Sequence, residues 1–132
     1  MKAVIIGRVQ PGENNASHWL NKFNEPYSKK TAMAIFPGSL NVALDENFDW
    51  FAPILKSKTV WFGREEYGGE RDILMLPCRL INLENRRAFL WTTTTAARER
   101  SDPSVVEIIT DVKLRQVYAL TDGSTVEIEL NL

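Results

Sequence analysis

The sequence has little of two chemically versatile residues, with one cysteine, Cys78, and one histidine, His18, among 132 residues. A single cysteine excludes a framework of internal disulfides. One histidine nearly excludes a zinc site built from His and Cys ligands, and a Ser-His-Asp triad has only His18 to use. The chemistry of this chain therefore has to come from other polar side chains.

The chain also lacks an excess of charge of one sign, since 16 Lys and Arg residues face 17 Asp and Glu residues. A broad surface for nucleic acid or for an anionic membrane needs an excess of basic residues, so we expect neither partner. No apolar run approaches the roughly 20 residues of a membrane helix, and the apolar start MKAVIIGRV is too short for a secretion signal. We expect a cytoplasmic protein, and the sequence indicates no oligomeric state.

Short apolar segments rich in β-branched residues, separated by turn residues, run through most of the chain. Strands are predicted at 3–9, 39–44, 59–63, 71–81, 86–93 and 105–110, and Val126, Ile128 and Leu130 alternate in a last strand. Turns are predicted at 37–38, 68–69, 82–85 and 121–123, and 94–104 is predicted to be a polar loop. Short helices are predicted around 17–23, 26–33, 50–55 and 112–118, the last capped by Asp111.

Many short strands at close spacing, with only short helices between them, predict a mainly β fold. The expected architecture is a small closed β-barrel in a single domain, 1–132. A doubly wound α/β fold would need longer helices between its strands.

A polar pair, Ser39 and Asn41, stands at the start of a predicted strand. Residues i and i+2 of a strand point to the same side, so the Ser hydroxyl and the Asn amide oxygen would lie together, while Leu40 and Val42 face the core. Two neutral oxygens at this spacing suit a magnesium ion whose other ligands are phosphate oxygens and water. The alternative is a strand start with a polar outer face.

A basic segment, VKLR at 112–115, opens a predicted helix. Free backbone N–H groups at a helix start and the charges of Lys113 and Arg115 favour an anion such as phosphate. The alternative is a solvated basic helix face.

Glu107 lies between two apolar residues, Val106 and Ile108, and alternation places it on the face opposite to theirs. There it would accept a hydrogen bond from a substrate hydroxyl or act as a base, unless it is an exposed strand carboxylate. The threonine run at 92–95 offers hydroxyls to a polyol or a phosphate, or simply ends a strand. The tryptophans are expected in the core or in a cleft wall: Trp19, Trp50, Trp61 and Trp91.

Three stretches, in this order, resemble the archaeal CTP-dependent riboflavin kinase family: PGSLNVAL at 37–44, VVEIITDVKLR at 105–115 and ALTDGSTVEIEL at 119–130. The family's pattern has an N-terminal strand, a glycine-rich loop and Pro-(Gly/Glu)-Thr-Leu-Asn. Near the end it has a strand with a glutamate, an (Asn/Met/Lys)-Leu-Arg helix start and Leu-x-Asp-Gly-Asp. The resemblance spans essentially the whole chain. It implies a six-stranded cradle-loop barrel that transfers a phosphoryl group from CTP to riboflavin, with magnesium as cofactor and FMN as product.

The resemblance also implies roles for individual residues. Ser39 and Asn41 occupy the positions of the magnesium-binding Thr and Asn of the family's motif, and Glu107 occupies that of the flavin-contacting Glu, which would orient or deprotonate the acceptor hydroxyl. The remaining implied positions are Thr94 or Thr95 for the flavin and, for the nucleotide, Gly12, Asn14, Val112, Lys113, Leu114 and Arg115.

The chain departs from the family in the nucleotide loop, which runs Gly-x-Gly-x-Gly-(Lys/Arg)-(Tyr/Phe) in the family and GENNASH at 12–18 here. Asn14 and Ala16 stand in the place of glycines, and Ser17 in the place of a basic residue. Asn adopts left-handed backbone conformations readily, whereas Ala does so only at a cost.

These departures predict weak nucleotide binding that depends on Lys113, Arg115 and magnesium. Restoring glycine at Ala16 and lysine at Ser17 is expected to strengthen it. The alternative function that the loop leaves open is a flavin- or nucleotide-binding or interaction barrel that has lost catalysis.

Overall fold

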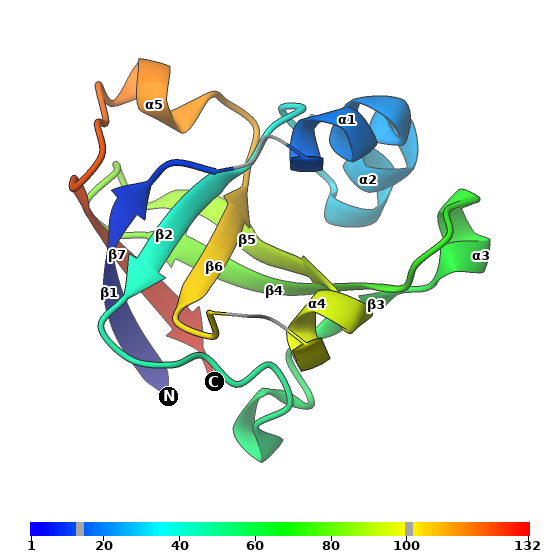
Figure 1. Cartoon of the computed structure of the whole chain (residues 1–132), viewed down its shortest axis with the longest axis horizontal. Helices are drawn as coiled ribbons and strands as arrows, with labels where there is room; N and C mark the ends of the chain where they lie inside the picture. Colours follow the sequence, from blue (N-terminus) through cyan, green and yellow to red (C-terminus); the bar gives the residue numbers. More distant parts are fainter. Residues whose placement is uncertain (13–14, 100–101) are drawn as a thin grey trace.

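The computed structural model describes residues 1–12, 15–99 and 102–132, and its strands form one antiparallel sheet that closes on itself (Figure 1). The strands are β1 (Lys2–Gln10), β2 (Leu40–Leu44), β3 (Val60–Phe62), β4 (Ile73–Leu80), β5 (Arg86–Thr93), β6 (Val105–Ile109) and β7 (Thr125–Asn131). Six of them form a barrel in the order β4-β5-β6-β2-β1-β7, closed by the pairing of β7 with the last part of β4. The short β3 pairs with the first part of β4. The predicted six-stranded barrel is therefore confirmed.

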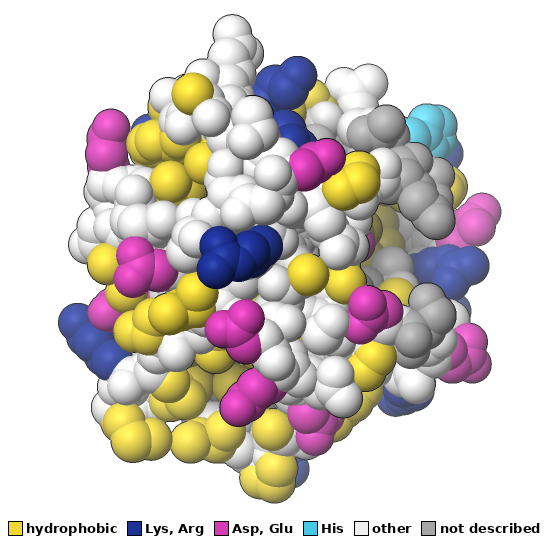
Figure 2. Space-filling view, turned by 60° about the vertical axis from the view of Figure 1, so that its left-hand side comes forward, with side chains coloured by type: hydrophobic (Ala, Val, Ile, Leu, Met, Phe, Trp, Pro, Cys, Tyr) yellow, Lys and Arg dark blue, Asp and Glu magenta, His cyan; other side chains and the backbone are white. Residues whose placement is uncertain are grey.

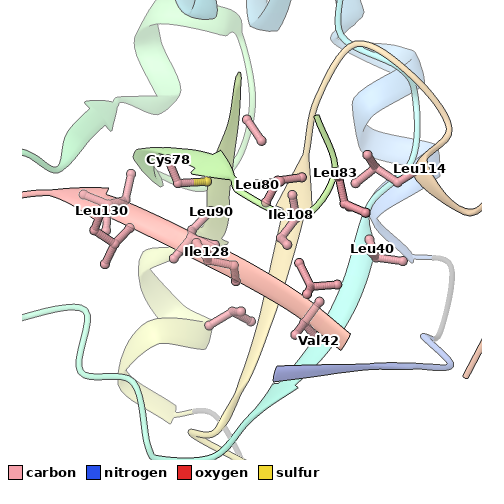
Figure 3. Packing of buried hydrophobic residues seen from close by; sticks show 14 of the residues in the cluster. Leu40, Val42, Cys78, Leu80, Leu83, Leu90, Ile108, Leu114, Ile128 and Leu130 are labelled. Atoms are coloured by element: carbon pink, nitrogen blue, oxygen red, sulfur yellow. The ribbon is translucent and has the colours of Figure 1, made fainter. Parts of the chain in front are cut away.

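The barrel interior is filled by apolar side chains from the inward-facing residues of the strands (Figure 3). On β7, for example, Val126, Ile128 and Leu130 are at most 4% exposed, as the alternation predicts. Cys78 lies in the same interior, and burial raises the pKa of its thiol to about 12. It therefore stays protonated and acts as a small apolar side chain.

A second apolar core lies outside the barrel, beneath α1 (Asn15–Lys22) and α2 (Asn24–Thr31). Leu20 and Tyr27 from these helices belong to one buried cluster with outward-facing residues of β4 and β5, among them Met75 and Trp91. Figure 1 shows the two helices side by side at one end of the barrel. Because this part of the sheet is covered on both faces, the first half of β4 is an unbroken run of buried residues.

The remaining helices are shorter than two turns: η1 (Pro53–Leu55), α3 (Arg64–Tyr67), α4 (Thr94–Glu99) and α5 (Leu114–Val117). The predicted turn at 68–69 lies in the connection between the antiparallel partners β3 and β4, but this connection is longer than a tight hairpin because it contains α3. Gly68 ends this helix in the left-handed region, with φ 75°, and its N–H bonds the Arg64 carbonyl. The predicted loop at 94–104 begins instead with α4, where the Thr93 hydroxyl accepts the Ala96 N–H at 3.0 Å.

The predicted helices at 50–55 and 112–118 are both shorter than expected. The helix at 50–55 is only a 3-10 turn, which starts at Pro53 because proline fits the first helical position. The prediction that Asp111 caps α5 is wrong: Lys113 is the N-cap, and Asp111 accepts a hydrogen bond from Arg86 at 2.6 Å. Asp111 therefore joins α5's approach segment to β5.

The surface carries charges of both signs. On the face drawn in Figure 2, acidic and basic side chains are interspersed rather than gathered by sign. Of the helices that the structure describes, none has the length and apolar character needed to cross a membrane.

Candidate functional site

A row of cross-strand neighbours crosses the outside of the barrel, and its last two members lie in the core beneath α1 and α2. Gln10 on β1 pairs with Asn41 on β2, and Asn41 pairs with Glu107 on β6. Glu107 pairs in turn with Trp91 on β5, which pairs with Met75 on β4. Residues directly opposite in antiparallel strands point to the same side, with their Cβ atoms about 5 Å apart. The row therefore changes from polar to apolar between Glu107 and Trp91.

Ser39 joins this row just before β2 begins. Its hydroxyl donates a hydrogen bond of 2.8 Å to Oε1 of Glu107, which is 68 positions away in the sequence. Leu40 and Val42 are buried in the barrel, whereas Ser39 and Asn41 are only partly buried. The predicted alternation is thus confirmed, and the predicted metal-binding pair and the predicted catalytic carboxylate form one cluster.

One cleft of about 1090 Å³ lies over the row. It brings together most of the site residues predicted from the sequence: Gly12, Ser39, Asn41, Glu107, Val112, Lys113, Leu114 and Arg115. Asn14 lies outside the described residues. At Gly12 a Cβ atom would stand 2.9 Å from Nδ2 of Asn41, so a larger residue at this position would clash with the Asn41 amide.

The predicted flavin threonines, Thr94 and Thr95, are not among the described residues that line the cleft. Thr94 is buried at the start of α4, and Thr95 is exposed. Thr92 and Thr93 line the cleft instead. Thr93 lies two positions after Trp91, and residues i and i+2 of a strand share a face, so alternation would have placed Thr93 on the cleft side.

The two basic residues at 113 and 115 differ in their surroundings. The guanidinium of Arg115 bonds the Asp122 carboxylate at 2.8 Å and the Gln10 carbonyl at 3.2 Å, so it fastens α5 to β1 and to the last turn. Lys113 is exposed, and no partner for its side chain occurs within residues 1–12, 15–99 and 102–132. Leu114 is buried in the barrel core and anchors the segment. Lys113 therefore lines the cleft with a charge that no side chain in the described ranges neutralises.

The other end of the cleft is lined by aromatic side chains: Trp19, Phe23, Tyr27, Tyr67 and Trp91. Trp91 donates a hydrogen bond from Nε1 to the Tyr27 hydroxyl at 3.1 Å. Burial raises the pKa of Tyr27 well above its usual value, so the hydroxyl keeps its proton. Of this set the sequence analysis placed only the tryptophans. The missed signal is the spacing of four from Trp19 to Phe23 and from Phe23 to Tyr27, which is typical of helical neighbours, although the three residues span the break between α1 and α2.

Ala16 and Ser17, the altered positions of the nucleotide loop, lie inside α1. Ala16 is 6% exposed and packs in the core under α1 and α2, and it is not among the residues with positive φ. Its place therefore demands no glycine, and the expectation that glycine at 16 relieves a backbone constraint is wrong.

Ala16→Gly is instead expected to destabilise the fold by about 1–2 kcal/mol, from lower helix propensity and a lost buried methyl. Thermal unfolding should show a melting temperature several degrees below that of the wild type. Ala34→Gly, at an exposed position outside any helix, is the matched control. Equal melting temperatures for both variants and wild type would contradict the helical placement of Ala16.

The fold is thus a small closed β-barrel with an external cleft that joins an oxygen-lined cluster to an aromatic wall, an arrangement typical of small-molecule sites. The family model CTP-dep_RFKase, described as a domain of unknown function, DUF120, matches residues 9–130. The chain belongs to this family.

Three archaeal proteins named riboflavin kinase are similar to the chain. The protein of Methanocella arvoryzae is 28% identical over 129 residues, which are 96% of this chain and 56% of that protein. The protein of Ignicoccus hospitalis is 26% identical, over 94% of this chain and 69% of its own length. The protein of Methanococcus maripaludis is 29% identical, over 85% and 83%. The chain thus spans little more than half of the Methanocella protein.

Proposed function

We propose that the chain is a riboflavin kinase that transfers the γ-phosphoryl group of CTP to the 5′-hydroxyl of riboflavin, giving FMN and CDP. The observation that carries this proposal is the Ser39–Glu107 hydrogen bond beside Asn41, at the junction of the cleft's polar and aromatic ends. The names of the three relatives support the acceptor, and the name of the family supports the donor.

Glu107 acts on the acceptor hydroxyl in the proposed reaction. The riboflavin 5′-oxygen forms a bond to the γ-phosphorus as the bond from that phosphorus to the β–γ bridging oxygen breaks. Glu107 takes the hydroxyl proton, and the electron pair of the broken bond leaves with CDP. Ser39 holds Oε1 through its 2.8 Å hydrogen bond and so fixes the direction of the carboxylate. Such a reaction depends mainly on positioning and electrostatics.

Ser39 and Asn41 fit a magnesium ion by the chemistry of their oxygens. The Ser39 hydroxyl donates a hydrogen bond to Glu107, so its oxygen lone pairs remain for a cation, and the Asn41 amide supplies a second neutral oxygen. No group of three or more His, Cys, Asp or Glu in the described part of the chain is placed to hold a metal. The ion therefore needs phosphate oxygens as further ligands. When bound, magnesium offsets charge on the transferring phosphoryl group.

The nucleotide phosphates lie, in this proposal, at the end of the cleft lined by Gly12 and Lys113. Lys113→Met keeps a long side chain and removes the charge, so it is expected to weaken CTP binding about tenfold, with a shallower salt dependence. Isothermal titration calorimetry at two salt concentrations measures both effects. Lys56→Met, at an exposed lysine outside the cleft lining, is the control.

Arg115→Met shows whether a basic residue of this segment acts on the stability of the fold rather than on CTP binding. Because Arg115 is tied to Asp122 and Gln10, its loss is expected to lower the melting temperature more than that of Lys113 does. Unchanged CTP affinity in Lys113→Met would contradict the assignment of this end of the cleft to the phosphates.

The direct test is incubation of the protein with riboflavin, magnesium and, in turn, CTP, ATP, GTP and UTP, followed by chromatographic detection of FMN. FMN formation that is fastest with CTP is the expected result. FMN formed only with another nucleotide would contradict CTP as the donor and leave the kinase activity itself standing. Riboflavin that raises the melting temperature while no nucleotide gives FMN would contradict the kinase and favour the non-catalytic flavin-binding barrel.

A further inference from the structure

A second pocket, of about 500 Å³, lies outside the cleft. It is formed by the segment after α2, the turn from β4 to β5 and the residues that flank α5. Three arginines line it, and we call it the arginine pocket: Arg79, Arg86 and Arg87. No described residue lines both this pocket and the cleft. A ligand held here is therefore separate from the proposed kinase reaction.

One of the three arginines already has a counterion. Arg86 donates hydrogen bonds to the Asp111 carboxylate at 2.6 Å and to the Tyr118 hydroxyl at 2.8 Å. Asp111 neutralises its charge, and the two bonds hold its guanidinium in place. Arg86 therefore shapes the wall of the arginine pocket and leaves the other two arginines as its uncompensated charge.

Those two, Arg79 and Arg87, are direct cross-strand neighbours on β4 and β5. Like charges placed directly opposite each other destabilise a sheet. Within residues 1–12, 15–99 and 102–132, neither forms an ion pair with a carboxylate. Arg79 donates to the Asn85 carbonyl at 3.4 Å, and Arg87 to the Thr31 carbonyl at 2.9 Å. These bonds leave most N–H donors of both guanidinium groups for a ligand.

The nearby carboxylates do not supply the missing counterion. Glu129 is the neighbour of Arg79 on β7, but its carboxylate faces Lys2 at 3.6 Å. Glu84 lines the arginine pocket from the turn, where it is exposed and forms no ion pair with any residue that the structure describes. An anion bound between Arg79 and Arg87 would relieve the repulsion that the fold leaves in place.

The backbone around the pocket is strained. Three of the four described non-glycine residues with positive φ line it: Ala32 at 55°, Glu84 at 58° and Asn85 at 54°. Such strain persists where the surrounding structure enforces it, and it clusters at ligand sites. The carbonyls of Ala32 and Asn85 accept hydrogen bonds from Arg87 and Arg79 respectively. The strained positions therefore help to fix the two guanidinium groups.

We propose that the arginine pocket binds a phosphate group, either free phosphate or the phosphate of a small organic ester, held by Arg79 and Arg87. A phosphate monoester carries roughly two negative charges at neutral pH, which two guanidinium groups match. The planar donors of arginine also fit phosphate oxygens in pairs. Met33 and Tyr118 line the same pocket and offer apolar contact to the organic part of an ester.

The test is isothermal titration calorimetry with inorganic phosphate and with phenyl phosphate, in a buffer without nucleotide or magnesium. Arg79→Gln is expected to weaken binding of both probes about tenfold, because it removes one of the two uncompensated charges. The control is Arg98→Gln, at an exposed arginine outside both linings, which should bind like the wild type. Lys113→Met removes a charge of the cleft and should also retain binding.

Nuclear magnetic resonance of the wild type locates the site without any variant. During a titration with phenyl phosphate, the backbone amide signals of Ala32, Asn85 and Arg87 should shift, and that of Gly12 should not. This measurement keeps the proposal testable if Arg79→Gln alters the fold.

The outcomes separate the arginine pocket from the cleft. Tighter binding of phenyl phosphate assigns the site to an organic ester and tighter binding of inorganic phosphate assigns it to the free ion; both support the proposal. Acetate that binds as tightly as phosphate overturns the choice of phosphate. Absence of binding by the wild type, or binding that Lys113→Met weakens and Arg79→Gln does not, overturns the site. None of these results depends on FMN formation, so the kinase function is tested separately.

Discussion

Glu107→Gln is expected to lower kcat for FMN formation about 100-fold, the scale typical of removing a general base. The amide keeps the shape of the side chain, and its oxygen still accepts the hydrogen bond from Ser39, so the cluster stays assembled. What is lost is the negative charge that takes the hydroxyl proton in the proposed reaction. Riboflavin affinity, measured by fluorescence, should change far less than kcat, because the rest of the cleft is untouched.

Glu127→Gln is the matched control, since Glu127 is also a partly buried strand glutamate but lies on β7, outside the cleft lining. It should turn over like the wild type. If Glu107→Gln also kept full turnover, Glu107 would be a strand carboxylate that only binds Ser39, and its proposed role as the general base would be wrong.

The strands were predictable because their signal is local. The prediction for β5, 86–93, has the bounds that the structure shows, and the alternation of β7 gives its buried face directly. A period of two in apolar residues needs no knowledge of partners, only a core on one side.

The short helices were harder, because each depends on contacts made elsewhere in the fold. In α3 the cap comes from Glu66, which accepts the Gly63 N–H and also holds Lys30 of α2. Helices of one turn have almost no stability of their own, so their sequence pattern is weak. The Thr93 cap of α4 was visible in the sequence, but it falls within a run of threonines that predicts a strand equally well.

The candidate site was predictable in its parts and not in its assembly. Alternation alone directed Ser39, Asn41 and Glu107 away from the core, as found. That Ser39 bonds Glu107, and that Trp91 neighbours it, follows from the register of β2 and β5 against β6, which is set by the closure of the whole barrel. The tether of Arg115 to Asp122 likewise depends on the path of the last turn, which brings the two side chains together.

Asn41→Ala is expected to reduce FMN formation by about 100-fold or more at moderate magnesium concentration. The cation's stabilisation of phosphoryl transfer is worth several kcal/mol, and each 1.4 kcal/mol is about tenfold in rate. Neither β1 nor β2 carries a carboxylate that could replace the Asn41 oxygen, and the carboxylate opposite Asn41, Glu107, is already bonded to Ser39. Steady-state rates across a magnesium titration measure the loss, and partial recovery at high magnesium is expected because the affinity for the ion is what falls.

Ser39→Thr and Ser39→Ala test the other oxygen of the pair. Threonine keeps the hydroxyl that bonds Glu107 and that would help hold the ion, so Ser39→Thr should retain activity, whereas Ser39→Ala should lose it together with the 2.8 Å contact. Calorimetry should detect magnesium binding to the wild type only when nucleotide is present, since Ser39 and Asn41 alone supply two neutral oxygens. Wild-type turnover in Asn41→Ala at every magnesium concentration would remove the metal from this cluster, and tight magnesium binding without nucleotide would mean that the ion has ligands other than the two oxygens named here.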